Sequence, residues 1–140
     1  MILALKTTGE TSELYLLDDA SSNSVKSEVG DGFLVAREEK WQAGRELGKT
    51  LLGKIEQFLA DKSFKGISGL IVFSGPGSFT GLRIGITTMN AIAYSESIPI
   101  VGVGGDNWLK DGVEKLENSE NNRIVIPNYG AEPNITIKKR

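Results

Sequence analysis

The fold of this chain is most restricted by two short, unbroken apolar runs: "GLIVFSG" at residues 69–75 and "IPIVGVGG" at residues 98–105. Both runs contain β-branched residues, and each predicts a strand that is covered on both faces. The segment 82–95 between them predicts a helix. A strand, a helix and another buried strand in this order predict a crossover connection within one sheet.

The first part of the chain shows a different pattern, with strands joined by tight turns. Segments 2–8 and 13–19 each predict a strand, and segments 25–29 and 33–37 predict one long third strand. Its interruption at the Gly-Asp-Gly sequence of residues 30–32 is compatible with a bulge or with a hairpin of its own. The three strands together predict an antiparallel meander.

After these strands the spacing of apolar residues becomes helical and predicts a helix over residues 41–62, which ends around residues 61–63. Residues 107–117 predict a short third helix, and "RIVIP" at residues 123–127 is compatible with a last strand before an extended tail. The whole order predicts an α/β fold of the ribonuclease-H-like type, the architecture of each actin-like ATPase lobe. Its core is a five-stranded mixed sheet with crossover helices.

Composition narrows the chemistry that is open to the chain. Its 140 residues suffice for one domain, and a formal net charge of −2 gives no basic field over the whole molecule to hold a nucleic acid. The absence of cysteine and histidine excludes thiol nucleophiles, Ser-His-Asp triads and zinc sites built from these residues. No apolar run reaches the length of a membrane span, so we expect no membrane partner and a cytoplasmic location.

A glycine-rich stretch, "SGPGSFTGLRIG" at residues 74–85, joins the first buried run to the predicted helix. Glycines before a helix N-terminus suit phosphate binding. The stretch nevertheless lacks the Lys-Ser/Thr pair of a P-loop and the G-x-G-x-x-G spacing of a dinucleotide site. The structural alternative is a sharp corner, in which Ser78 or Thr80 caps the helix and Phe79 anchors in the core. The loop residues are Gly75, Pro76, Gly77, Ser78, Phe79, Thr80 and Gly81.

The helix that follows this loop is apolar on several sides instead of along one stripe. Such a helix is either deep in a core or docked against another protein. One sheet of this size leaves little material to cover both sides, which favours partner docking. An ordinary buried crossover helix is the alternative. The candidate partner-binding residues are Arg83, Ile86, Thr87, Met89, Asn90, Ala93 and Tyr94, with Arg83 as the first choice for a polar contact.

The end of the first strand carries a lysine where catalytic relatives of this architecture carry an acid. In catalytic ribonuclease-H-like domains and actin-like ATPases, that acid holds a metal ion or its waters, whereas "LALKTT" places Lys6 there. The acids Asp18, Asp19 and Asp31 are explained by a strand end and a turn, and no carboxylate set for two-metal chemistry emerges. We therefore predict no catalytic residue, no metal and no cofactor.

Three segments together resemble the TsaB (YeaZ) family, which belongs to the larger group of Gcp/TsaD-like proteins. They are "GPGSFTGLRIG" at residues 75–85, "IPIVGVGG" downstream and "MILALKTT" at the start. The loop motif is long and specific, and the resemblance runs from residue 1 to about residue 109. It implies an actin-like, ribonuclease-H-related N-terminal lobe over residues 1–109. Residues 110–140 would form a short linker, an extra strand and a C-terminal tail.

The resemblance also implies a function. TsaB family members are non-catalytic subunits in the bacterial synthesis of N6-threonylcarbamoyladenosine (t6A) in tRNA, and they pair with the catalytic subunit TsaD through a helical interface. The expected partners are therefore a TsaD-like subunit, a TsaE-like ATPase through the complex, a second copy in a homodimer, and tRNA only indirectly. The alternative is an actin-like domain that binds a nucleotide or phosphate with the Gly75–Gly81 loop.

The sequence departs from the family pattern at two points. The family usually reads Asp-Thr/Ser where this chain has Lys6-Thr7, which speaks against any remnant of metal or nucleotide binding. Family members also usually continue into a second lobe, whereas here a polar linker leads to "IPNYGAEPNITIKKR", which resembles the family's own C-terminal tail at Tyr129, Pro133 and Ile135. The resemblance thus implies a shortened form that lacks most of the second lobe.

Overall fold

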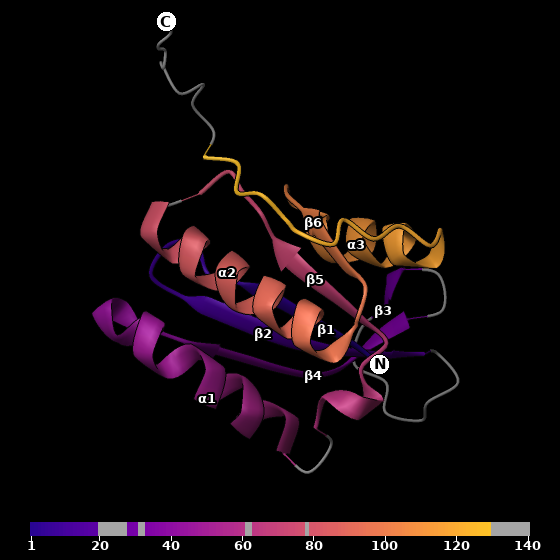
Figure 1. Ribbon diagram of the computed structural model, residues 1–140, viewed down its shortest axis with the longest axis horizontal. Coiled ribbons are helices and arrows are strands. Elements are labelled where there is room, and N and C mark those ends of the chain that lie inside the picture. The colour runs from indigo at the N-terminus through magenta and orange to yellow at the C-terminus, as the bar shows by residue number, and fades with distance from the viewer. Residues whose placement is uncertain (20–27, 31–32, 61–62, 78, 130–140) are drawn as a thin grey trace, which may run out of the picture.

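A mixed sheet forms the centre of the computed structural model (Figure 1), which describes residues 1–19, 28–30, 33–60, 63–77 and 79–129. Within these residues the sheet has six strands in the order β3-β4-β2-β1-β5-β6. The strands are β1 (Ile2–Lys6), β2 (Ser12–Asp19), β3 (Glu28–Gly30), β4 (Phe33–Trp41), β5 (Gly69–Phe73) and β6 (Ile100–Val103). The helices are α1 (Leu47–Leu59), α2 (Phe79–Glu96) and α3 (Trp108–Glu117), with short 3₁₀ turns at η1 (Gly44–Glu46) and η3 (Phe64–Gly66).

The strand pairing confirms the predicted α/β fold class. β1 pairs antiparallel with β2, and β2 pairs antiparallel with β4, which forms the predicted meander. β1 pairs parallel with β5, and β5 pairs parallel with β6, as expected for strands joined by crossover helices. The short β3 pairs antiparallel with β4, so the interrupted third strand is a hairpin and adds a sixth strand to the five that were predicted.

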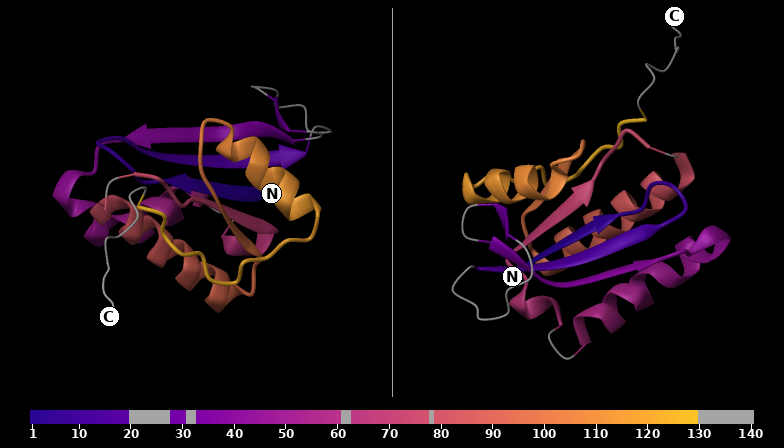
Figure 2. Two further views of the ribbon diagram at one scale, coloured as in Figure 1. Left: turned by 90° about the horizontal axis from the view of Figure 1, so that it is seen from above. Right: turned by 180° about the vertical axis from the view of Figure 1, so that it is seen from behind.

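Helices α1 and α2 cover one face of the sheet and α3 lies on the other (Figure 2). α3 packs on β5, where Gly112 lies against Ile71 and the Trp108 ring is 5.7 Å from the Phe73 ring. On the opposite face, α2 lies against Thr7, just beyond the end of β1. The largest fully buried side chains are Leu3, Leu5, Leu14, Leu17, Leu51, Ile55, Phe58, Leu59, Leu70, Ile71, Leu82 and Met89.

The helix predicted over residues 41–62 is shorter than expected. β4 continues to Trp41, which pairs with Ser12 of β2, and α1 occupies only Leu47–Leu59. Strand pairing decides this boundary, because a helix that began at Trp41 would leave the backbone groups at this end of β2 unpaired. Residues 61 and 62 lie outside the described ranges.

The segment after α3 forms no strand in its described part, although residues 123–127 were considered as a last strand. We call residues 120–129 the strap. The strap runs along the free edge of β6. Side chains of the strap form hydrogen bonds with backbone groups of this strand. Asn121 Oδ1 accepts from the Ile100 N–H at 3.1 Å, and Asn122 Oδ1 accepts from the Gly102 N–H at 2.8 Å. The Asn122 N–H donates to the Ile100 carbonyl at 2.8 Å.

The strap then crosses α2, where one carboxamide holds it. Asn90 Nδ2 donates to the Val125 carbonyl at 3.0 Å, and the Val125 N–H donates to Asn90 Oδ1 at 2.9 Å. Val125 is buried, and the Asn128 N–H donates to the Ser74 carbonyl at 2.7 Å. The side chain of Asn90 thus satisfies both backbone groups of Val125, as a neighbouring strand would.

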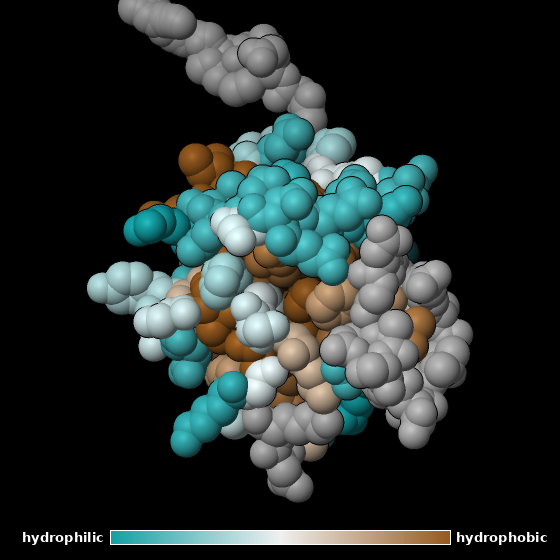
Figure 3. Space-filling view, turned by 90° about the vertical axis from the view of Figure 1, so that its right-hand side faces the viewer, coloured by the Kyte–Doolittle hydropathy of each residue, from teal (hydrophilic) through white to brown (hydrophobic). Residues whose placement is uncertain are grey.

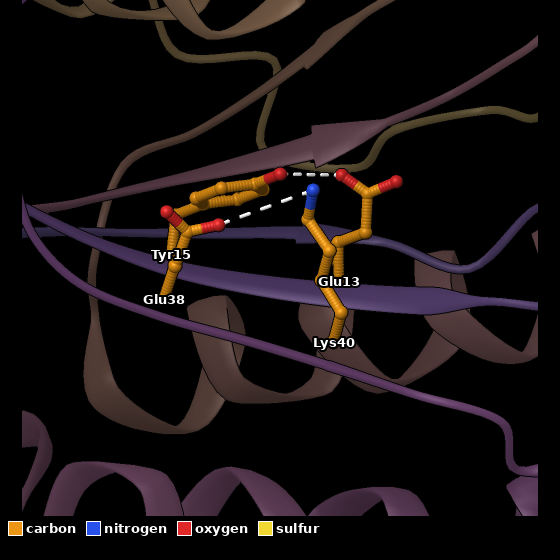
Figure 4. Close-up of polar contacts among 4 residues, drawn as sticks. All are labelled: Glu13, Tyr15, Glu38 and Lys40. Carbon is orange, nitrogen blue, oxygen red and sulfur yellow. Dashed lines mark hydrogen bonds and ion pairs between the residues drawn. The ribbon is translucent and has the colours of Figure 1, made fainter. Parts of the chain in front are cut away.

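A polar cluster lies on β2 and β4 (Figure 4), on the face of the sheet where the Tyr15 ring is 5.8 Å from the Trp108 ring of α3. Tyr15 on β2 donates a hydrogen bond to Glu13 on the same strand, and Glu38 and Lys40 stand opposite them on β4. Burial of the Tyr15 phenol raises its pKa above the ordinary value of 10.0, and the hydrogen bond and negative charge of Glu13 raise it further. The folded chain therefore favours the neutral phenol.

This pKa shift predicts a loss of stability at high pH. In the unfolded chain Tyr15 loses its proton around pH 10.0, whereas the folded chain retains it to higher pH. The unfolded state then binds fewer protons, so the free energy of unfolding falls as the pH rises above about 10. Urea unfolding at pH 8 to 11 should show this fall, and Tyr15→Phe should reduce it. Equal pH profiles for the two proteins would contradict the assignment to Tyr15.

Candidate docking site

The glycine-rich stretch forms the corner between β5 and α2, and Ser78 within it lies outside the described residues. A Cβ at Gly75, whose φ is +121°, would lie 1.9 Å from the Asn128 carbonyl oxygen. A Cβ at Gly77 would lie 2.4 Å from Thr8 Cγ2. These glycines therefore permit close approach of the strap and of the loop after β1. This geometry favours the structural interpretation of the loop over the phosphate interpretation.

The first turns of α2 sit directly on the end of β1. Thr7 Oγ1 donates to the Gly81 carbonyl at 2.7 Å, and Gly85 lies one turn further along against the same threonine. The expectation that Phe79 anchors in the core is wrong, because Phe79 is 55% exposed. Its position at the start of α2 carries it past the end of the sheet, where it stacks on Tyr129 with ring centroids 4.5 Å apart.

Three of the predicted partner-binding residues belong to the chain's own core. Ile86, Met89 and Ala93 are 2%, 0% and 5% exposed. They face the sheet and the neighbouring elements that cover it, so they cannot form the surface of a docking site in this conformation. For these three positions the alternative of a buried crossover helix describes the structure better.

The other four predicted residues lie on different parts of the surface of α2. Arg83, Thr87 and Tyr94 are exposed, Tyr94 by 88%. The Arg83 guanidinium lies 5.3 Å from the centre of the Phe79 ring. Asn90 is only partly exposed and is occupied by the strap. Arg83 and Thr87 are brought together, and Tyr94 stands two turns further along the helix.

A groove between α1 and α2 contains Arg83 and Thr87. One hollow of about 430 Å³ is lined by Gly48, Thr80, Arg83, Ile84, Thr87 and Thr88. Thr80 and Ile84 also line a second hollow of about 500 Å³, which extends to the β1–β2 turn and to the segment before α1. Leu52, one turn after Gly48 on α1, is 50% exposed. The groove thus combines apolar and polar surface from two helices.

Sequence reasoning missed Gly48, Leu52 and Thr88 as parts of this surface. Leu52 lies within the segment that was predicted as a helix, and the buried stripe of α1 is Leu47, Leu51, Ile55, Phe58 and Leu59. Helical spacing puts Leu52 beside this stripe, and that offset was a usable signal. The glycine inside the predicted helix, Gly48, is a second signal, because it leaves that point of the helix surface without a side chain.

The end of β1 places Lys6 on the α3 side of the sheet. Its ammonium lies 4.5 Å from the centre of the Phe73 ring, and Glu13 is its partner in the strand register. Across the described ranges, no three Asp, Glu, His or Cys side chains gather where they could hold a metal ion. No helix in those ranges combines the length and apolar character of a membrane span.

A hollow with apolar lining lies at the opposite end of the sheet, where Figure 3 shows hydrophobic surface framed by hydrophilic side chains. It has a volume of about 480 Å³, and its lining includes Ile2, Phe33, Gly69, Pro99 and Leu116. This hollow shares no residue with the glycine-rich corner or the α1–α2 groove.

Comparisons with known proteins converge on one family. The sequence profile of the TsaD family, tRNA N6-adenosine threonylcarbamoyltransferase, matches residues 41–129. The tRNA threonylcarbamoyladenosine biosynthesis protein TsaB of Bacillus subtilis is 44% identical over 43 residues, which are 31% of this chain and 19% of that protein. The tRNA N6-adenosine threonylcarbamoyltransferase of Geotalea daltonii is 41% identical over 63 residues, which are 44% of this chain and 18% of that protein.

Two solved structures share the fold. YeaZ from Pseudomonas aeruginosa has a TM-score of 0.55 and 21% identity, and the match covers 74% of this chain and 43% of that one. A protein with similarity to peptidase YEAZ, also from Pseudomonas aeruginosa, has a TM-score of 0.57 and 23% identity, with 74% and 42% covered. The chain thus spans less than half of these structures and about a fifth of the curated relatives. The resemblance to TsaB (YeaZ) proteins and the actin-like, ribonuclease-H-like fold are confirmed.

Proposed function

The chain belongs to the TsaD family, tRNA N6-adenosine threonylcarbamoyltransferase, and from this premise we propose that it is a non-catalytic subunit in t6A synthesis, acting in the cytoplasm. The matches to both TsaB and TsaD support involvement in this modification. The non-catalytic role is supported by Lys6, which stands at the end of β1 and contacts Phe73. Catalytic relatives of the fold have a metal-binding acid at this position, and a lysine side chain cannot bind a metal ion in its place.

The proposed partner is a TsaD-like catalytic subunit that docks into the α1–α2 groove. The observation that carries this proposal is the exposed surface of two adjacent helices, in which Arg83 and Thr87 of α2 line the groove together with Gly48 of α1. Helices that present a mixed apolar and polar groove are suited to packing against helices of another protein. A TsaE-like ATPase would join through the complex, and a second copy of the chain would compete for the same surface.

The alternative of a phosphate or nucleotide on the Gly75–Gly81 loop is less well supported. The Asn128 carbonyl packs against Gly75 and the Thr8 side chain against Gly77, so these two glycines have a packing role in the chain itself. Because two of its three glycines pack against the strap and against Thr8, we assign the loop the role of fixing the direction in which α2 leaves the sheet.

The docking proposal predicts that Gly48→Arg weakens binding to the cognate TsaD-like subunit by about tenfold or more. Gly48 lines the groove, and a Cβ there would meet only Ile84 Cδ1 at 3.7 Å, an ordinary contact. The arginine would therefore fill the groove without straining the fold. Isothermal titration of the TsaD-like subunit with each variant measures the effect.

Gly53→Arg is the matched control, because Gly53 is on the same helix, exposed and without neighbours within 4 Å. Helical spacing places it on a different side of α1 from Gly48. We expect this control to bind as the parent chain does. Equal weakening by both variants, or no binding by the parent chain, would refute docking through this groove.

A further inference from the structure

The exposed ring pair at the start of α2 is held in place from both sides. Phe79 is the first residue of α2, and Tyr129 closes the described part of the strap. The hydrogen bond from Asn128 to Ser74 and the close approach of Asn128 to Gly75 fix the strap beside this corner. The two rings lie 4.5 Å apart at an angle of 25°. They form a preformed, nearly parallel stack.

This stack contributes little to the core and remains open to solvent. Phe79 is 55% exposed and Tyr129 is 38% exposed. The Arg83 guanidinium lies 5.3 Å from the Phe79 ring, and none of the ion pairs among the described residues involves it. The two stacked rings therefore remain partly exposed next to a cation that forms no ion pair with a carboxylate among the described residues.

Aromatic rings with an adjacent guanidinium suit one ligand chemistry in particular. Unpaired bases stack on aromatic side chains and on arginine, and the arginine also pairs with the phosphate that each base carries. A purely apolar protein side chain would gain nothing from the unpaired charge. The combination of flat rings and free cation therefore favours a nucleotide of a single-stranded segment.

The charge of the following sequence points the same way. The whole chain has a net charge of −2, yet beyond Tyr129 its only acid is Glu132, and it ends in Lys138, Lys139 and Arg140. Lys138 lies nine positions after Tyr129, a chain length that spans at most roughly 30 Å. Basic residues tethered next to the ring pair would raise the local concentration of a nucleic acid.

We propose that Phe79, Tyr129 and Arg83 form a stacking platform for an unpaired base of RNA. This inference rests on the proposed function in t6A synthesis, and it replaces the expectation that contact with tRNA is only indirect. The low overall charge still argues against a broad grip on the phosphate backbone, so the platform would add one local contact to an RNA that the complex holds.

The test is fluorescence anisotropy of the full chain with a labelled RNA hairpin that has an unpaired loop. A blunt duplex RNA of the same length is the control probe. We expect the hairpin to bind more tightly than the duplex. Phe79→Ala and Tyr129→Ala should each weaken hairpin binding by about tenfold or more, the effect of losing one base–aromatic stack. Ile126→Ala is the matched control, an exposed apolar side chain on the strap, and should bind as the parent chain does.

The same variants are also titrated with the TsaD-like subunit, which separates this inference from the proposed function. Unchanged partner binding together with weakened RNA binding supports the platform. Equal binding of hairpin and duplex, or variants that bind the hairpin like the parent chain, would overturn it. Variants that lose binding to the TsaD-like subunit but still bind RNA would overturn the proposal as well, because the rings would then be a contact with protein. The RNA experiment needs no partner. Its result can therefore be interpreted even if the Gly48→Arg titration refutes docking through the groove.

Discussion

Met89→Lys is expected to unfold the chain rather than to weaken a docking surface. Met89 is completely buried, and a lysine there would place a charge, without a partner, between α2 and the sheet. Buried unpaired charges belong to the small class of substitutions that cost on the order of 4–5 kcal/mol or more. A domain with a total stability of roughly 5–15 kcal/mol would lose most of its folded population.

Circular dichroism with urea unfolding measures this effect directly. Thr87→Lys is the control, since it places the same side chain on the same helix at an exposed position. It should change the midpoint of unfolding little. A Met89→Lys protein that melts like the parent chain would show that α2 is not packed as described. The same reasoning applies to Ile86→Asp, so neither variant is a valid test of docking.

Gly85→Ala should destabilise the chain by roughly 1–3 kcal/mol, although alanine is the better helix former. A Cβ at Gly85 would lie 2.1 Å from Thr7 Oγ1 and 3.2 Å from Thr7 Cβ. Rotation of the threonine would relieve only the first contact, and it would break the hydrogen bond from Thr7 to the Gly81 carbonyl. Helix α2 would have to move away from β1, which opens the core beneath it.

Gly53→Ala is the control for Gly85→Ala, and it should change the free energy of unfolding in the opposite direction. Gly53 lies within α1, is exposed and has no neighbour within 4 Å. Here alanine removes only the entropic cost of a helical glycine, which should raise the free energy of unfolding by up to about 1 kcal/mol. Thermal melts of the two variants would therefore move in opposite directions. A Gly85→Ala protein as stable as Gly53→Ala would refute the close packing of α2 on Thr7.

The order of the secondary structure could be predicted because the sequence pattern is strong where strands are buried. The apolar runs around β5 and β6, and the helical pattern between them, correctly predicted the crossover that joins these two parallel strands. The end of β4 at Trp41 could not be predicted in the same way. It depends on pairing with Ser12, a residue twenty-nine positions earlier that a local pattern does not contain.

The candidate site was predicted less well, for a reason that concerns α2. The helix was predicted to be apolar on several sides, whereas its buried residues fall on one face: Leu82, Gly85, Ile86, Met89, Ile92 and Ala93. The strap lies across the helix and is held by Asn90 through Val125, and no periodicity in residues 120–129 indicates this. Met89 and Ala93 were therefore assigned to a partner, although they belong to the chain itself.

The side-chain amides of Asn121 and Asn122 also decide how this protein meets other copies of itself. The outermost strand of a sheet carries a row of open backbone groups, on which another chain can add a strand. At β6 those groups are already saturated, because Ile100 and Gly102 bond to the two asparagines instead of to a strand. An asparagine side chain cannot extend the ladder further, so this edge is closed to strand addition. The β6 edge is thereby protected against edge-to-edge association without a seventh strand.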